Sequence, residues 1–110
     1  VAVLRRRHRS VTDVPVLLRY DNESDVLYVK RAGATIRTSR EAAHDGGLIV
    51  NLDAASAIVG VQLLAASEMP AALWRNHPDR SALPDDIART IDAWLDARPP
   101  RAQDRAMREM

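Results

Sequence analysis

Three acidic side chains at alternate positions, Asp21, Glu23 and Asp25, have the spacing most suggestive of chemistry in this sequence. The same alternation opens the calcium loop of an EF-hand, in which carboxylate oxygens ligate the ion. That loop also needs glycine at its sixth position and glutamate at its twelfth, where this chain has Val26 and Ala32. Asp side chains in tight turns accept hydrogen bonds from nearby amides. We therefore predict a capped β-turn, with Asp21 and Asp25 bonded to amides of the turn, and no metal.

The remaining chemistry-bearing residues lack the spacing that a catalytic or cofactor site requires. The serines include no G-x-S-x-G elbow, the histidines no HxH, HxxxH or HExxH pair, and no glycine-rich phosphate loop occurs. His77-Pro78-Asp79 matches the loop tripeptide of Hsp40-type J-domains, but that motif acts between two long antiparallel helices, which the flanking pattern does not predict. Ser67 fits the N-cap of a helix. We predict no catalytic residue and no cofactor.

The composition fits one small domain. A chain of 110 residues with 46% apolar residues can bury a core, but aromatic residues make up only 4%, so aliphatic side chains must fill it. Cysteine is absent, which removes disulfides and thiolate metal sites and favours a cytoplasmic location. The longest apolar run is far shorter than the roughly 20 residues of a membrane-spanning helix, so no membrane association is predicted.

The charge of the chain is unevenly distributed. Residues 1–10 hold four arginines and no acid, and without these arginines 12 basic side chains face 15 acidic ones, a formal charge of −3. Nucleic-acid binding needs a contiguous basic surface. We therefore predict that residues 1–13 form a basic flexible arm, dispensable for folding, and that no nucleic acid is bound sequence-specifically. Residues 99–110, which begin with two prolines, are predicted to form a charged tail.

Alternating apolar residues predict five strands, over residues 14–20, 26–31, 35–42, 48–52 and 59–63. The third strand is poor in large aliphatic residues, which suits a sheet edge. The connection from Asp53 to Ala57 is short enough for an antiparallel hairpin. Asn51, Gly60 and Gln62 lie on the opposite face from the apolar residues, which predicts a sheet covered on one side only.

Two helices are predicted after the strands. The first is short and carries Leu73 and Trp74. The second runs from about Pro84 to Arg98, and its apolar stripe consists of Leu83, Ile87, Ile91, Trp94 and Leu95. Trp74 and Trp94 supply bulk to a core without phenylalanine or, alternatively, anchor an interface. The predicted fold is a single α+β domain over residues 14–98, a five-stranded antiparallel meander with both helices on one face.

The string Tyr20-Asp21-x-Glu23-x-Asp25-x-Leu27-Tyr28-Val29 resembles the opening motif of small bacterial proteins catalogued as domain of unknown function 2283. Residues 48–53, which end at Asp53, and residues 59–67, which include Gly60 and Ser67, resemble the closing strand pair of that family and its exit into a helix. The resemblance covers about residues 16–69 and implies a structural role for these motif residues. Asn51 and Gln62 replace acids that are usual in the family, and Ala55-Ser56 replaces its Asp-Gly turn.

The resemblance implies no established activity. Members of the family sometimes occur beside toxin-like genes, which implies an antitoxin or partner-binding role. We expect a non-enzymatic protein-binding domain that self-associates through a sheet edge or a helix, most simply as a homodimer, with a toxin-like protein as a second class of partner. The alternative is a small enzyme or ligand-binding module, which a deep polar pocket between sheet and helices would favour.

Overall fold

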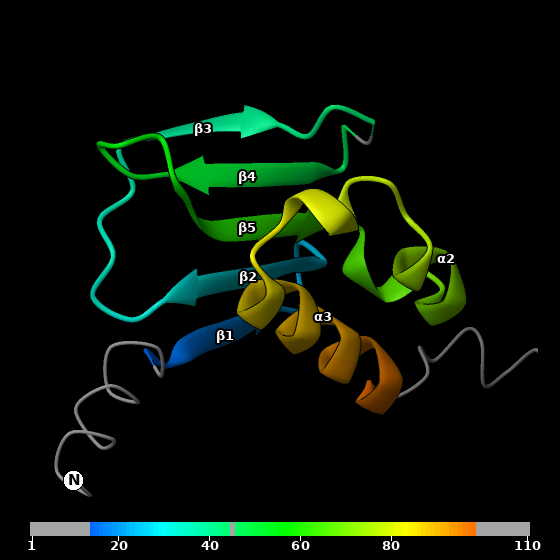
Figure 1. Ribbon diagram of the computed structural model, residues 1–110. Helices are drawn as coiled ribbons and strands as arrows, with labels where there is room; N and C mark the ends of the chain where they lie inside the picture. Colours follow the sequence, from blue (N-terminus) through cyan, green and yellow to red (C-terminus); the bar gives the residue numbers. More distant parts are fainter. Residues whose placement is uncertain (1–13, 45, 99–110) are drawn as a thin grey trace, which may run out of the picture.

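Five antiparallel strands form one sheet: β1 (Val16–Asp21), β2 (Val26–Arg31), β3 (Thr38–Glu41), β4 (Leu48–Leu52) and β5 (Ile58–Leu64). The helical segments follow β5: η1 (Ala66–Glu68), α2 (Ala71–Arg75), η2 (Arg80–Ala82) and α3 (Asp85–Ala97). The computed structural model describes residues 14–44 and 46–98, so the predicted arm and tail lie outside the described residues. The α2 and α3 helices lie on the same side of the sheet (Figure 1), and the predicted α+β fold is confirmed.

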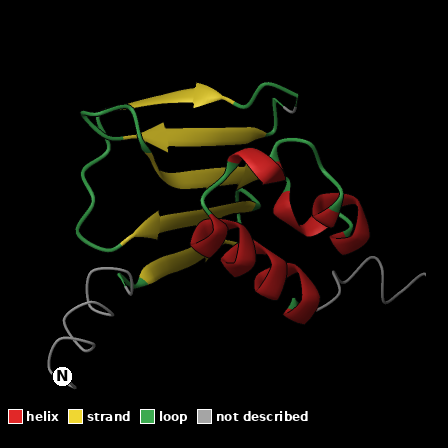
Figure 2. Cartoon of the chain, in the orientation of Figure 1, coloured by secondary structure: helices red, strands yellow, loops and turns green. Residues whose placement is uncertain are grey.

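The spatial order of the strands is β1-β2-β5-β4-β3, which corrects the sequential meander expected from the sequence. After β2 the chain passes to the far edge of the sheet, and β3, β4 and β5 then return toward β2 (Figure 2). This order follows from burial. The mostly buried β5 gains neighbours on both sides, whereas all four residues of β3 are exposed and its polar side chains suit an edge. The edge position predicted for the third strand is confirmed.

The core lies between the sheet and the helices. Cross-strand pairing aligns Leu27 with Leu63 and aligns Val29 with Val61, and these side chains are at most 1% exposed. The α3 helix covers them with the predicted stripe, of which Ile87, Ile91 and Leu95 are buried. Trp74 of α2 is also fully buried. Apart from this one indole, the buried core is aliphatic, as the composition predicts.

Trp94 departs from its predicted place in the buried stripe. Its ring is only partly buried and packs on Tyr20, with the ring centroids 4.9 Å apart and the planes tilted by 44°. The position next to Leu95 therefore lies at the border of the apolar stripe, where a large amphipathic ring covers the edge of the core. The α3 helix packs on β1 and β2 of its own chain.

Gly60 is required at the centre of the sheet by a close backbone approach. A Cβ atom at this position would lie 2.8 Å from the Val29 carbonyl oxygen and 3.3 Å from the Asn51 side-chain nitrogen. The first distance is a backbone clash that no rotamer change can relieve. Asn51 itself is 3% exposed and accepts a hydrogen bond from the Ser39 hydroxyl at 2.8 Å, which fixes its amide beside the glycine.

We expect Gly60→Ala to lower the free energy of unfolding by about 1–3 kcal/mol, because β2 and β5 must separate to admit the methyl group. Urea denaturation of the two proteins measures the difference. Gly46→Ala is the matched control, since its added Cβ would meet only the Glu41 carboxylate at 3.7 Å. Equal losses in the two variants would show that the close approach at Gly60 has no energetic weight.

Candidate functional site

Asp25 joins the β1–β2 turn to the segment that follows β5. Its Oδ1 accepts hydrogen bonds from the Tyr20 hydroxyl at 2.6 Å and from the Ser67 amide at 2.9 Å. Its Oδ2 accepts the Ser67 hydroxyl at 2.7 Å, and its backbone carbonyl accepts the Ala66 amide at 3.0 Å. Carboxylate and backbone thus hold the chain where it leaves β5. We call the Tyr20, Asp25 and Ser67 side chains the aspartate clamp.

Asp21 caps the β1–β2 turn as predicted. Its Oδ1 accepts the Glu23 and Ser24 amides at 3.0 and 3.4 Å. Hydrogen bonds from Ser24, first that of its side chain and then that of its amide, hold the pKa of Asp21 below its ordinary value. The same prediction for Asp25 is wrong, because its carboxylate bonds Ser67, 42 residues away, instead of amides of its own turn. Asp25 adopts a left-handed backbone with φ of 58° at the end of this turn.

The assignment of Ser67 as a helix N-cap is also wrong. Ser67 lies inside η1, and the residue that precedes this turn is Ala65, with φ of 52°. The residue that precedes α2 is Pro70, and no side chain caps either segment. A serine between an apolar strand and a helical pattern matches the N-cap signal locally, but its hydroxyl donates to the carboxylate of Asp25, 42 residues away in sequence.

The end of α3 closes over the same cluster. The Trp94 ring packs against Tyr20, the residue that donates to Asp25. Arg98 follows the helix and donates from Nη1 to the Ala66 carbonyl at 2.7 Å. The amide of Ala66 is bonded to Asp25 as well, so both backbone polar groups of Ala66 are bonded to residues distant in sequence.

A second buried aspartate fastens the turn between β3 and β4. Asp79 is 4% exposed, and its two carboxylate oxygens accept the His44 amide at 3.1 and 3.0 Å. The Nδ1 atom of His44 lies 3.0 Å from Oδ1, and the Asp79 amide donates to Nδ1 of His77 at 3.1 Å. Burial raises the pKa of Asp79, but the hydrogen bonds from His44 outweigh it and leave the pKa below the ordinary value.

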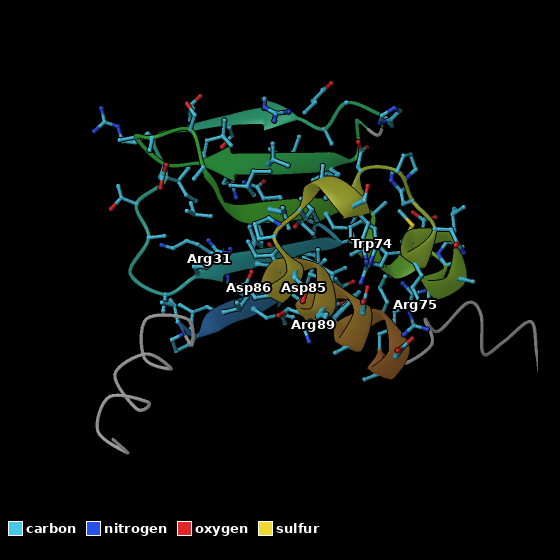
Figure 3. All side chains as sticks on the ribbon, in the orientation of Figure 1. Arg31, Trp74, Arg75, Asp85, Asp86 and Arg89 are labelled. Carbon is cyan, nitrogen blue, oxygen red and sulfur yellow. The ribbon has the colours of Figure 1, made fainter. Side chains whose placement is uncertain are left out.

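Two aspartates of α3 tie the helix to its surroundings. Asp92 accepts the Trp74 indole N–H at 2.8 Å and the Arg80 Nε–H at 3.0 Å. Asp86 pairs with the Arg31 guanidinium through two bonds of 2.9 Å, and Figure 3 shows Arg31 on the sheet facing Asp86 on the helix. Hydrogen bonds from Arg80 and Arg31, respectively, lower the pKa values of these two carboxyls.

These arrangements hold distant segments of the fold together. Both described histidines contact Asp79, His44 with its ring and His77 as the acceptor of the Asp79 amide. The carboxylate of Asp25 already receives three donors. Among the described residues, no three His, Asp or Glu side chains gather as metal ligands. No described helix is long and apolar enough to cross a membrane.

The other motif residues lie in the core, in turns and on the open face of the sheet. Leu27 is fully buried in the core, and Glu23 is exposed on the turn. The Tyr28 ring lies on the sheet face without helices, with the Arg19 guanidinium carbon 4.3 Å from its centroid. Asp53 accepts the Ala55 and Ala57 amides at 2.9 and 3.0 Å and so shapes the β4–β5 turn.

Three of the tying aspartates were not predicted as site residues. Asp86 is recognisable in the sequence as an acid in the first turn of a helix, but its partner Arg31 is 55 residues away. Asp92 lies next to the apolar stripe of α3. An acid so close to the core needs hydrogen-bond donors, which here are Trp74 and Arg80. Asp79 carries no local signal beyond its tripeptide. Trp74 is buried in its own chain, the core alternative considered for it, whereas an interface role for Trp94 stays a prediction.

An open hollow of about 450 Å³ lies at the opposite end of the sheet from the aspartate clamp. Thr35, Arg37, Asp53, Ala54 and Ala55 line it. The Asp53 carboxylate accepts amides of its own turn. Of the two charged side chains that line the hollow, Arg37 is therefore the one not engaged in this turn. The hollow lies between a loop and a turn, not between sheet and helices.

The fold and its clamp define a class of small α+β domain in which an antiparallel sheet is fastened at one end to a single helical layer. Residues 18–67 match the model of the family described as "Protein of unknown function (DUF2283)", and this segment belongs to that family. The matched segment begins within β1 and ends at Ser67, so it contains all three residues of the aspartate clamp. No curated protein and no solved structure matches the chain significantly.

We expect Asp25→Asn to lower the free energy of unfolding by about 2 kcal/mol, because an amide group replaces one acceptor oxygen with a donor that faces other donors. Glu23→Gln removes an exposed charge from the same turn and should change stability by less than about 0.5 kcal/mol. Urea denaturation at neutral pH compares the variants. If Asp25→Asn matches the Glu23→Gln control, the clamp does not stabilise the fold.

Four described aspartates have lowered pKa values, and acid should destabilise this protein mainly through the three that tie distant segments together, Asp79, Asp86 and Asp92. Their contribution is complete above the unfolded-state pKa of 3.8 and is lost as the pH falls through the lower folded-state values. The urea midpoint should therefore be flat from about pH 7 to pH 5 and fall steeply below about pH 4. Asp92→Asn should be less stable at neutral pH and lose less stability in acid. A midpoint unchanged down to about pH 3 would contradict this account.

Proposed function

We propose that this domain is a non-enzymatic protein-binding module that self-associates. The observation that carries the proposal is the apolar surface exposed on β1. The carboxylates of Asp25, Asp79, Asp86 and Asp92, by contrast, are engaged in hydrogen bonds within the domain. Leu17 is 55% exposed and Leu18 is 40% exposed, on opposite faces of the same strand. Exposed apolar residues that gather on one element are typical of interaction surfaces.

The sheet face without helices is the second feature that supports binding. Cross-strand pairing places one row of side chains across this face, consisting of Arg19, Tyr28, Gln62, Ile49 and Glu41. Tyr28, Ile49 and Gln62 are half-buried at its centre. Positive charge at the β1 end and negative charge at the β3 end flank them. A mixed face with an aromatic centre and a charged rim resembles a protein interface more than a substrate pocket.

The family supplies the second class of partner. An antitoxin-like role would use the same surface to hold a toxin-like protein. The alternative of a small enzyme or ligand-binding module would need the hollow near Arg37, but that lining offers one charged side chain outside the turn cap, so titratable groups do not converge there. Binding of protein is therefore the function that the arrangement of described residues favours.

Self-association is tested by light scattering coupled to gel filtration. The full chain at micromolar concentration should elute with the mass of a dimer or a larger species, and dilution should shift it toward the 12.2 kDa monomer. Raised salt should weaken the assembly only partly, because apolar contacts carry much of it. A strictly monomeric protein that turns over a small substrate, with activity abolished by one substitution in the hollow, would defeat the proposal.

A further inference from the structure

The two edges of the sheet differ in how well they are protected against pairing. The β3 edge is short, and its four residues Thr38–Glu41 are all polar or charged. The β1 edge has six residues and begins with three aliphatic side chains in succession, Val16, Leu17 and Leu18. Natural proteins protect exposed edges with short strands, charges, prolines or bulges. Over the first half of β1 these devices are missing.

The backbone groups that face outward from β1 follow from its pairing with β2. The Ala32 amide donates to the Pro15 carbonyl at 2.8 Å, so Pro15 is in register with Ala32 as a hydrogen-bonded pair. Such pairs alternate along an antiparallel ladder, which directs Leu17 toward β2 and directs Val16 and Leu18 outward. The missing N–H of Pro15 faces inward and does not protect the edge. Among the described residues, no strand pairs with this outer side.

We propose that β1 pairs antiparallel with β1 of a second copy, with the two-fold axis at Leu17, so that the two sheets become one. This rests on the proposed self-association and names its surface. In this register Val16 of each chain lies opposite Leu18 of the other. Because both residues direct their backbone groups outward, they form the two hydrogen-bonded pairs that flank the axis.

The side chains of this register match one another on both faces. Leu17 meets its own copy at a pair without hydrogen bonds, where side chains approach most closely. Val16 and Leu18 meet on the helix-bearing face. Arg19 lies opposite Pro15 of the partner copy, so no like charges stand directly opposite one another between residues 15 and 19. The strand is thus complementary to itself.

The β1 edge of a second copy fits the β1 edge better than the β3 edge of a second copy would. Pairing of β1 with the polar β3 of a neighbour would put Leu17 and Leu18 opposite exposed polar residues. Such a contact is also head-to-tail and would continue into an open filament, whereas the two-fold contact closes as a dimer. Closure removes the apolar edge and leaves only the protected β3 edges exposed.

Disulfide cross-linking at the two-fold axis tests the pairing. The chain has no cysteine, so Leu17→Cys introduces a single thiol in the full-length protein. Residues opposite each other at a pair without hydrogen bonds have Cα atoms about 4.5 Å apart, within the range that a disulfide spans. Leu73→Cys on α2 is the matched control, because Leu73 is 57% exposed and Leu17 is 55% exposed.

Under mild oxidation at micromolar concentration, Leu17→Cys should give a covalent dimer on non-reducing gels in about tenfold or greater excess over Leu73→Cys, since pairing raises the effective thiol concentration. Leu17→Lys should weaken the dimer by about tenfold or more in light scattering, because it places like charges opposite each other, whereas Leu73→Lys should not. A wild-type dimer that neither Leu17 variant distinguishes from its Leu73 control would overturn the edge pairing and leave the proposed function standing. A wild-type monomer would overturn both.

Discussion

The carboxylate of Asp25 is the constraint on which the arrangement of this domain depends. It sits in the β1–β2 turn and bonds the hydroxyl and amide of Ser67, just after the chain leaves β5. The helices that cover the core all follow that point. The direction in which the chain leaves β5 is therefore fixed by a residue from the opposite end of the family segment. The beginning and the end of that segment are in direct contact.

The same device recurs at the other turns and in the helices, and it answers a need set by composition. The core is almost entirely aliphatic, and such side chains pack without strong directional preference. Asp79 bonds the backbone of the β3–β4 turn, Asp92 fixes the Trp74 indole, and Asp86 fixes α3 on β2. Hydrogen-bonded polar groups at the core boundary specify one geometry, because each left unpaired would carry a desolvation cost. Aspartates thus fix where the turns and helices lie in this fold, and aliphatic residues fill its core.

The sequence could predict the interactions between residues close together in the chain, but not those between distant residues. Local strand and turn patterns mark all five strands, and Asp21 caps amides two and three residues ahead, so these features are local and were predicted. The roles of Asp25 and Ser67 were mistaken, because turn and cap rules are also local while their bond spans 42 residues. The strand order was mistaken for the same reason. Hairpin signals join neighbours in sequence, but the pairing of β2 with β5 is set by burial.

The strand order also decides which surface the domain leaves open. In a sequential meander β5 would be an edge strand. In the observed order it lies between β2 and β4, and six of its seven residues are half-buried or buried. Placing β5 inside moves β3 to one edge and keeps β1 at the other. The polar residues of β3 tolerate water, whereas Leu17 and Leu18 do not benefit from it. Burial of β5 inside the sheet thus leaves the apolar β1 at one edge, and under the proposed pairing a second copy covers this edge.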